Sequence, residues 1–164
     1  MAVVDYFLKI DGIPGESTDS KHKDEIELMS FSWGVTNAAQ VATGSGRAGR
    51  VTFQDFEFSK LFDKASPQLF LKCVNGAHIP SVTLTARKSS DNEVANADFL
   101  KIVFNNVLIS FYKEQEPNRD QFTGEAVGAL FQKMSLTFIP TRSVTGAAAV
   151  APITVSADAA SSDG

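Results

Sequence analysis

The alternation of apolar and polar residues along the chain predicts a protein built mainly of β-strands. After Pro80, the side chains of Val82, Leu84 and Ala86 alternate with polar ones, as in a strand with one buried face. The same kind of pattern predicts further strands at Tyr6–Ile10, Ile26–Val35, Val51–Lys60, Phe99–Tyr112 and Ala126–Thr141. A weaker pattern at Val150–Ser156 offers one more strand. This set of strands predicts an all-β barrel or sandwich.

Several predicted strands switch the face that carries their apolar residues. The switch in Val51–Lys60 falls at Gln54–Asp55, and the switch in Phe99–Tyr112 falls at Asn105–Asn106. Ile26–Val35 has apolar residues on both faces. Bulges and bends produce such switches and curve a sheet, so the pattern favours a closed barrel over a flat sheet.

One short helix is predicted between the strand Val51–Lys60 and the strand that follows Pro80. Ser66 is a suitable N-cap, Pro67 fits the first helical position, and Gly76 fits a left-handed residue at the end. Helical spacing places four apolar residues in one stripe, namely Leu69, Phe70, Cys73 and Val74. A single amphipathic helix in a strand-rich chain is typical of one that plugs or flanks a barrel.

The segment Thr36–Gly49 has almost no large side chains and is long for a hairpin connection. It is either a protruding assembly loop or a surface loop without a role, and composition does not decide between them. Its glycines spell Gly44-x-Gly46-x-x-Gly49, which matches the dinucleotide-binding pattern as a string. A strand follows instead of a helix, so a bound phosphate would meet no helix N-terminus. We therefore predict no nucleotide cofactor.

The bulk properties indicate one domain with an aromatic core. The chain has 164 residues, including thirteen phenylalanines, and a net charge of −4 that gives nucleic-acid binding no electrostatic support. Its single cysteine, Cys73, suits a reducing compartment. We expect no membrane insertion and no cleaved signal peptide, because the apolar runs are short and the basic N-terminal region of a signal is missing. The expected location is the cytoplasm, with any export by a route that needs no cleaved signal.

Residues for catalysis or metal binding do not form a recognisable pattern. His22, His78 and Cys73 lack the spacing of a structural zinc site, and Ser32 lies outside any nucleophile elbow. The carboxylates are scattered through loops, with no pair marked as acid and base. We predict no catalytic residues, no metal site and no cofactor. An enzyme is therefore the least favoured class of function.

Several segments, taken in order, resemble the Hcp family of tube-forming subunits from bacterial type VI secretion. The resemblance covers roughly residues 1–140. Its segments are Asp5–Ser17, Ser32-Trp33-Gly34, the Gly-rich loop entering Val51–Phe56, Asp63–Pro67 and Thr85–Lys88. No single segment is diagnostic, and their order and spacing carry the specificity.

The resemblance implies a compact β-barrel with one helix that forms homo-hexameric rings. Such rings stack into a hollow tube that a contractile sheath surrounds and that carries a trimeric spike protein at its tip, and a baseplate is a further partner. Small secreted effectors travel in the lumen, and the tube leaves the bacterial cytoplasm for a target cell. The long loop resembles one that family members extend to neighbouring subunits or rings. We therefore place candidate subunit contacts in it, at Val41, Gly44, Gly46 and Arg47.

The chain departs from this family at its C-terminal end. Many members end in a strand with an aromatic Gly-Trp-like segment, whereas residues 143–164 are rich in Ala and Ser and contain no aromatic residue. We expect a barrel domain over residues 1–142 and a segment over 143–164 that is either a final strand or a tail. The alternative function is a monomeric β-barrel that binds a small hydrophobic ligand in its aromatic-rich interior.

Overall fold

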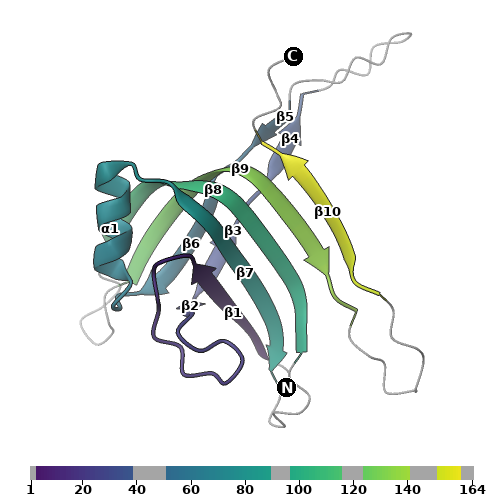
Figure 1. Cartoon of the computed structure of the whole chain (residues 1–164), viewed down its shortest axis with the longest axis horizontal. Helices are drawn as coiled ribbons and strands as arrows, with labels where there is room; N and C mark the ends of the chain where they lie inside the picture. The colour runs from purple at the N-terminus through teal and green to yellow at the C-terminus, as the bar shows by residue number, and fades with distance from the viewer. Residues whose placement is uncertain (1–2, 39–50, 90–96, 116–123, 141–150, 160–164) are drawn as a thin grey trace.

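The computed structural model describes residues 3–38, 51–89, 97–115, 124–140 and 151–159. These residues form a nearly closed, barrel-shaped sheet with one helix against it (Figure 1). The strands are β1 Val3–Ile10, β2 Ile26–Leu28, β3 Ser30–Ser32, β4 Val35–Asn37, β5 Val51–Phe53, β6 Phe56–Leu61, β7 Ile79–Ser89, β8 Ala97–Gln115, β9 Gly124–Phe138 and β10 Ile153–Asp158. The helix, α1, spans Ser66–Asn75. The predicted fold class, mainly β with one short helix, is confirmed.

The order of the strands explains why the sheet is nearly closed. The main sheet runs β2-β1-β7-β8-β9-β6-β3, and β10 also pairs with β9. The two ends of this order, β2 and β3, are separated in the chain by Met29 alone. The N–H of Met29 donates to the carbonyl of Ser59 on β6, at 2.8 Å. One continuous stretch of backbone therefore bridges the two edges of the sheet.

The core contains a cluster of phenylalanine rings, but most of its buried residues are aliphatic, so the prediction of an aromatic core holds only in part. Phe56 and Phe104 are almost fully buried, and their rings stack with centroids 4.5 Å apart. The ring of Phe131, on β9, packs against that of Phe104, with the two centroids 4.8 Å apart. Aromatic pairs of this kind add to the stabilisation that burial of their area provides. The core thus lies on the inner side of the sheet, where β6, β8 and β9 adjoin.

The prediction of a single strand over Ile26–Val35 is wrong. This part of the chain instead forms the short strands β2 and β3 and the first residue of β4. Each has a different antiparallel partner: β2 pairs with β1, β3 with β6, and β4 with β5. Ile26 and Leu28 face the core, whereas Met29 is 59% exposed where the chain crosses between the two sheet edges. The change of partner accounts for the apolar residues on both faces.

The predicted switches of face are present. The break at Gln54–Asp55 separates β5 from β6. In β8, buried positions change from Ile102 and Phe104 to Val107 and Ile109, and Asn106 between them has a φ of +52°. The side chain of Asn106 donates to Gln132 on β9 at 2.8 Å, where β9 changes face as well. The neighbouring strands β8 and β9 therefore bend at the same level, which curves the sheet.

The helix begins differently from the prediction. The N-cap residue is Ala65, and no side chain caps this end, so the prediction of Ser66 as N-cap is wrong. Ser66 is buried because its hydroxyl joins a polar network below the helix. Gly76 ends the helix with a φ of +65°, as predicted. Leu69 is buried and Cys73 half-buried, but Phe70 and Val74 are 55% and 67% exposed, so the predicted stripe packs only in part.

The segment after residue 150 contributes the strand β10, over Ile153–Asp158. β10 pairs antiparallel with β9 over Ile153↔Phe138 to Asp158↔Lys133. It needs no aromatic residue, because Ile153 and Val155 supply the β-branched side chains that strands favour. Among the described residues, no helix has the length and apolar content needed to cross a membrane.

Candidate assembly surfaces

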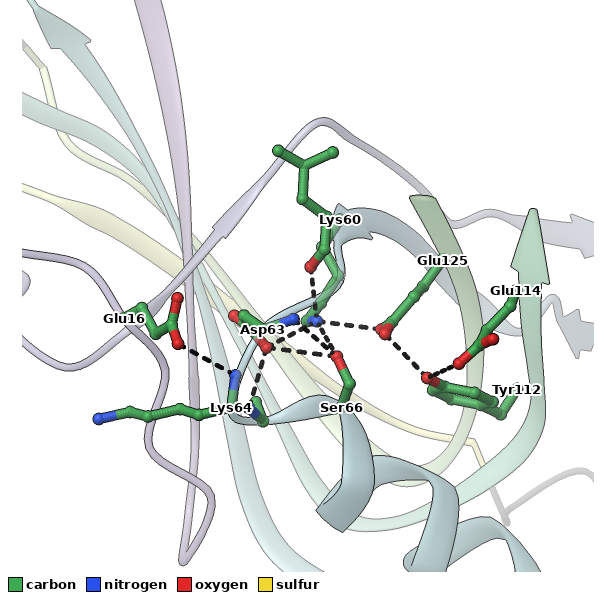
Figure 2. A network of polar contacts seen from close by, with 10 residues as sticks. Glu16, Lys60, Asp63, Lys64, Ser66, Tyr112, Glu114 and Glu125 are labelled. Carbon is green, nitrogen blue, oxygen red and sulfur yellow. Dashed lines mark hydrogen bonds and ion pairs between the residues drawn. The ribbon is translucent and has the colours of Figure 1, made fainter. Parts of the chain in front are cut away.

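A buried polar network fixes the helix to the barrel (Figure 2). Lys60 of β6 is fully buried, and its Nζ lies 2.8 Å from Asp63 Oδ1 and 3.0 Å from Glu125 Oε2. It also donates to the hydroxyl of Ser66, the first residue of α1, at 2.9 Å. A buried ammonium needs such partners, because its removal from water is costly. Lys60 therefore joins β6, β9 and the start of the helix at one point.

Tyr112 of β8 extends this network to a further strand. Its hydroxyl oxygen lies 2.8 Å from Glu125 Oε1 and 3.2 Å from Glu114 Oε1, and its one proton is shared between these two acceptors, with Glu125 the nearer. Burial, together with the hydrogen bond to Glu125 and the charges of both carboxylates, raises the pKa of Tyr112 far above its ordinary value. The hydroxyl thus keeps its proton and remains a donor.

A second polar cluster fastens the loop between β1 and β2. The guanidinium of Arg87, on β7, lies 2.7 Å from Asp19 and 3.5 Å from Asp5. Its carbon Cζ is 4.8 Å from the centroid of the Phe7 ring, which also stacks on the His22 ring at 4.4 Å. These contacts hold the loop against the wall of the barrel.

His22, which the sequence left without a partner, belongs to the same cluster. Its Nδ1 lies 2.8 Å from Glu25 and its Nε2 lies 3.1 Å from Asp98 at the start of β8. The side chain of His22 is 8% exposed. His78 lies in the turn between α1 and β7, as predicted. Within the described ranges, no group of three His, Cys, Asp or Glu side chains is placed to hold a metal ion.

The carboxylate of Asp19 gives a pH-dependent prediction. Burial alone would raise the pKa of Asp19, but the hydrogen bond and charge of Arg87 and the backbone N–H groups of Lys21 and His22 lower it below 3.8. A lowered folded-state pKa stabilises the fold above the unfolded value, and this stability is lost as the pH falls through the folded value. In urea titrations from pH 7 to pH 3, we expect Asp19→Asn to be less stable than the parent at neutral pH. The difference in free energy of unfolding between the variant and the parent should disappear below about pH 4. A difference that does not depend on pH would contradict this assignment.

Outside these clusters, exposed apolar side chains gather on α1 and on the β9–β10 pair, among other places. Figure 1 shows α1 and β10 at opposite ends of the long axis. The first, the helix face, lies on α1 and consists of Phe70, Leu71 and Val74, which are between 48% and 67% exposed. The second, the β10 face, lies on β9 and β10 and consists of Leu136, Phe138, Ile153 and Val155.

The β10 face continues the core-facing side of the sheet beyond the core. Ile153 pairs with Phe138 and Val155 with Leu136, so the four side chains point the same way. Leu136 packs against the core, whereas Phe138, Ile153 and Val155 are 51%, 60% and 61% exposed. All six residues of β10 are exposed, which means that no described part of the chain covers this strand.

The opposite face of the same two strands is polar. The hydroxyls of Ser135 and Ser156 lie 2.9 Å apart, as do those of Thr137 and Thr154. One side of the β9–β10 pair is therefore suited to water and the other to a protein partner. The alternation of Ile153, Thr154, Val155 and Ser156 in the sequence carries this signal.

The predicted loop contacts Val41, Gly44, Gly46 and Arg47 lie outside the described residues, so they stay predictions. The structure places the ends of that segment: β4 and β5 form a separate two-stranded ribbon, with Asn37 opposite Val51. This ribbon, which we call the arm, extends away from the barrel at the top of Figure 1.

Comparison with known proteins identifies the family. The family model described as "Type VI secretion system effector, Hcp" matches residues 7–159. The chain belongs to the Hcp family. Members of this family assemble into the tube of the type VI secretion system and are secreted by it. Membership confirms the family predicted from the sequence, supports the role of a tube subunit, and does not favour a barrel that binds a hydrophobic ligand.

Individual Hcp proteins show the same likeness. Protein hcp1 of Pseudomonas aeruginosa is 34% identical over 109 residues, a match that spans 65% of this chain and 65% of that relative. The crystal structure of Hcp1 from Salmonella typhimurium is 33% identical, with a TM-score of 0.75 over 96% of this chain and 95% of that one. A type VI secretion system effector from Yersinia pestis is 30% identical, with a TM-score of 0.73 over 94% and 99%.

Proposed function

We propose that this chain is a structural subunit of the inner tube of a type VI secretion system. The observation that carries the proposal is the uncovered β10 face, an apolar surface that continues the core side of the sheet. A second copy of the chain that covered it would complete a core that one chain leaves open. Full burial of a Val, Ile or Phe side chain stabilises by about 1.5–3 kcal/mol, so burial of the exposed parts of Phe138, Ile153 and Val155 provides a substantial contact.

The two apolar surfaces suit a ring. A closed ring of identical subunits needs a head-to-tail contact between two different surfaces on each copy. The β10 face and the helix face differ and lie at opposite ends of the long axis. In the proposed homo-hexamer, the β10 face of one subunit contacts the helix face of the next, and the sixth contact closes the ring.

The polar side of β8, β9 and β10 lines the lumen in this arrangement. Lys101 and Lys133 are exposed there, beside the hydroxyl pairs of Ser135–Ser156 and Thr137–Thr154. Such a wall stays hydrated and does not adhere to an apolar cargo, which suits the passage of small secreted effectors. The hydroxyl pairs support this orientation, because the opposite side carries the apolar contact.

The remaining parts of the role follow from membership in the family and are proposed with it. Rings stack into a hollow tube that a contractile sheath surrounds and a trimeric spike protein tips, and a baseplate is a further partner. The protein is made in the bacterial cytoplasm and leaves it without a cleaved signal peptide. In this assembly, residues 1–142 provide the barrel and residues 143–164 provide β10, while Val41, Gly44, Gly46 and Arg47 provide loop contacts.

Native mass spectrometry of the purified protein tests the proposal. We expect a dominant species with six times the 17.6 kDa mass of the chain. A monomer as the dominant species at high concentration would count against the ring. Such a monomer that bound apolar fluorescent probes in its interior would favour the ligand-binding barrel instead.

A further inference from the structure

A buried histidine lies in the loop between β1 and β2, residues 11–25, which we call the first loop. The side chain of His22 is 8% exposed, and its imidazole stacks on the ring of Phe7 with the two centroids 4.4 Å apart. Its Nδ1 lies 2.8 Å from Glu25 Oε2, and its Nε2 lies 3.1 Å from Asp98 Oδ1. The imidazole is therefore held at both nitrogens and against one face.

Both partners of the imidazole are hydrogen-bond acceptors. An ionised carboxylate has no proton to donate, so each of the two contacts needs an N–H group on the histidine. A neutral imidazole has one N–H group, and its other nitrogen turns a lone pair toward the second carboxylate. The imidazolium has two N–H groups and the opposite charge to both partners. The contacts of His22 are thus complete only when both ring nitrogens carry a proton.

The basic side chains nearby leave Glu25 and Asp98 to the imidazole. Among the described residues, the charged side chains of positions 19–25 and of the Phe7 side of β1, β2, β7 and the start of β8 are Asp5, Lys9, Asp19, Lys21, Lys23, Asp24, Glu25, Glu27, Arg87, Asp98 and Lys101. Arg87 pairs with Asp19 at 2.7 Å and with Asp5 at 3.5 Å. Neither Glu25 nor Asp98 forms an ion pair with a described lysine or arginine. The charge of these two carboxylates is therefore balanced by His22 alone among the described side chains.

The imidazole joins the first loop to a strand far along the chain. Within the loop, the N–H of Ser17 donates to the carbonyl of Glu25 at 3.0 Å, and the N–H of Asp24 donates to the carbonyl of Ser17 at 2.9 Å. These bonds tie the two limbs of the loop together, and Figure 1 shows the loop beside β1. Asp98, on β8, is 76 positions from His22. The contact between them thus links the whole loop to β8.

We propose that His22 is a proton-controlled latch between the first loop and the wall of the barrel. The protonated imidazole bridges Glu25 of the loop and Asp98 of β8, and loss of its proton loosens the loop from β8. Because the closed loop favours the protonated form, the stability that the latch provides is present at low pH and is lost as the pH rises and the imidazole loses its proton. Arg87 holds the part of the loop around Asp19 in both states. The latch lies within one chain and does not depend on the ring.

Hydrogen exchange followed by mass spectrometry tests the latch. The parent and Asp98→Ala are compared at the same pH, in steps from about pH 5.5 to about pH 8.5, so that the intrinsic effect of pH on exchange cancels. At the lowest pH, we expect peptides from residues 11–25 to exchange about tenfold faster in the variant, the effect of one lost charge-assisted hydrogen bond. At the highest pH, the two proteins should exchange alike. Peptides from β7 and β9 should exchange equally throughout, which shows that the fold persists.

Two further variants and a spectroscopic measurement complete the test. His22→Gln should remove the pH dependence of the loop, because an amide does not titrate in this range. Lys23→Gln removes an exposed charge from the same loop and should follow the parent at every pH. Nuclear magnetic resonance of the two imidazoles shows where each titrates, and the loop should loosen with His22 and not with the exposed His78.

Two results would overturn the latch. A difference between Asp98→Ala and the parent that is the same at every pH would show that His22 only packs against the barrel. The absence of any difference would show that its contact with Asp98 does not hold the loop.

Discussion

Replacement of Lys60 by methionine is expected to lower the free energy of unfolding by about 3–5 kcal/mol, the range for removal of one partner from a buried ion pair. The side chains of Lys60 and Glu125 are both fully buried, with Nζ and Oε2 3.0 Å apart. Methionine fills a similar space but leaves the Glu125 carboxylate without a cation. The Tyr112 hydroxyl remains as its donor and does not supply a charge.

The measurement is urea unfolding of purified variants, followed by circular dichroism. It should be made in a background that does not assemble, because association adds to apparent stability by mass action. Lys60→Met/Glu125→Gln provides the second half of the test. We expect the double variant to recover part of the loss, since no carboxylate then lies opposite methionine. A loss below about 1 kcal/mol for Lys60→Met would show that the network does not hold the helix.

The second large effect is expected at the β10 face. Val155→Asp should remove hexameric rings while it leaves the barrel folded. Val155 is 61% exposed in one chain, so the carboxylate stays in water there. In the proposed ring the same position is buried, and a charge at such a site costs several kcal/mol. About 3 kcal/mol already weakens association more than 100-fold.

Ser156→Asp is the matched control for this variant. It places the same charge on the next residue of β10, on the side that carries the hydroxyl pairs. We expect rings to survive in this control. Size-exclusion chromatography with light scattering gives the mass of the particles that each variant forms. Thermal unfolding shows whether each variant is still folded. Rings in Val155→Asp would rule out the β10 face as the ring contact.

A mixing experiment tests the head-to-tail pairing of the two surfaces. Val74→Asp on the helix face should also give monomers, because Val74 is 67% exposed and faces the next subunit in the proposed ring. An equal mixture of Val155→Asp and Val74→Asp copies retains one intact contact per pair. We therefore expect heterodimers and no rings. Heterodimers would not form if each surface contacted its own equivalent on the neighbouring copy.

The sequence predicted the features that depend on local patterns. The break at Gln54–Asp55 and the switch at Asn105–Asn106 are visible as changes in which alternate residues are apolar, and both are present. Gly76 was predicted correctly because a left-handed residue at a helix end favours glycine. Order and spacing of short segments identified the family, which the comparisons confirm.

Features that depend on distant partners were not predictable in this way. Lys60 and Glu125 are 65 positions apart, and nothing near either residue marks the other. The same holds for His22 and Asp98, which are 76 positions apart. Ser66 looked like an N-cap because its residue type suits one, but a tertiary contact with Lys60 recruited its hydroxyl.

The division of Ile26–Val35 into β2, β3 and β4 has a related cause. Apolar alternation indicates an extended backbone, but it does not say that the backbone changes partner at Met29 and again after Ser32. The loop contacts at Val41, Gly44, Gly46 and Arg47 stay predictions.

Negative-stain electron microscopy of the purified parent, with the particle mass measured on the same sample, tests the central claim most directly. We expect annular particles with a central lumen and a mass of six chains, some of them stacked into short tubes. A uniform population of single chains at high concentration, with no annular particles, would contradict the account.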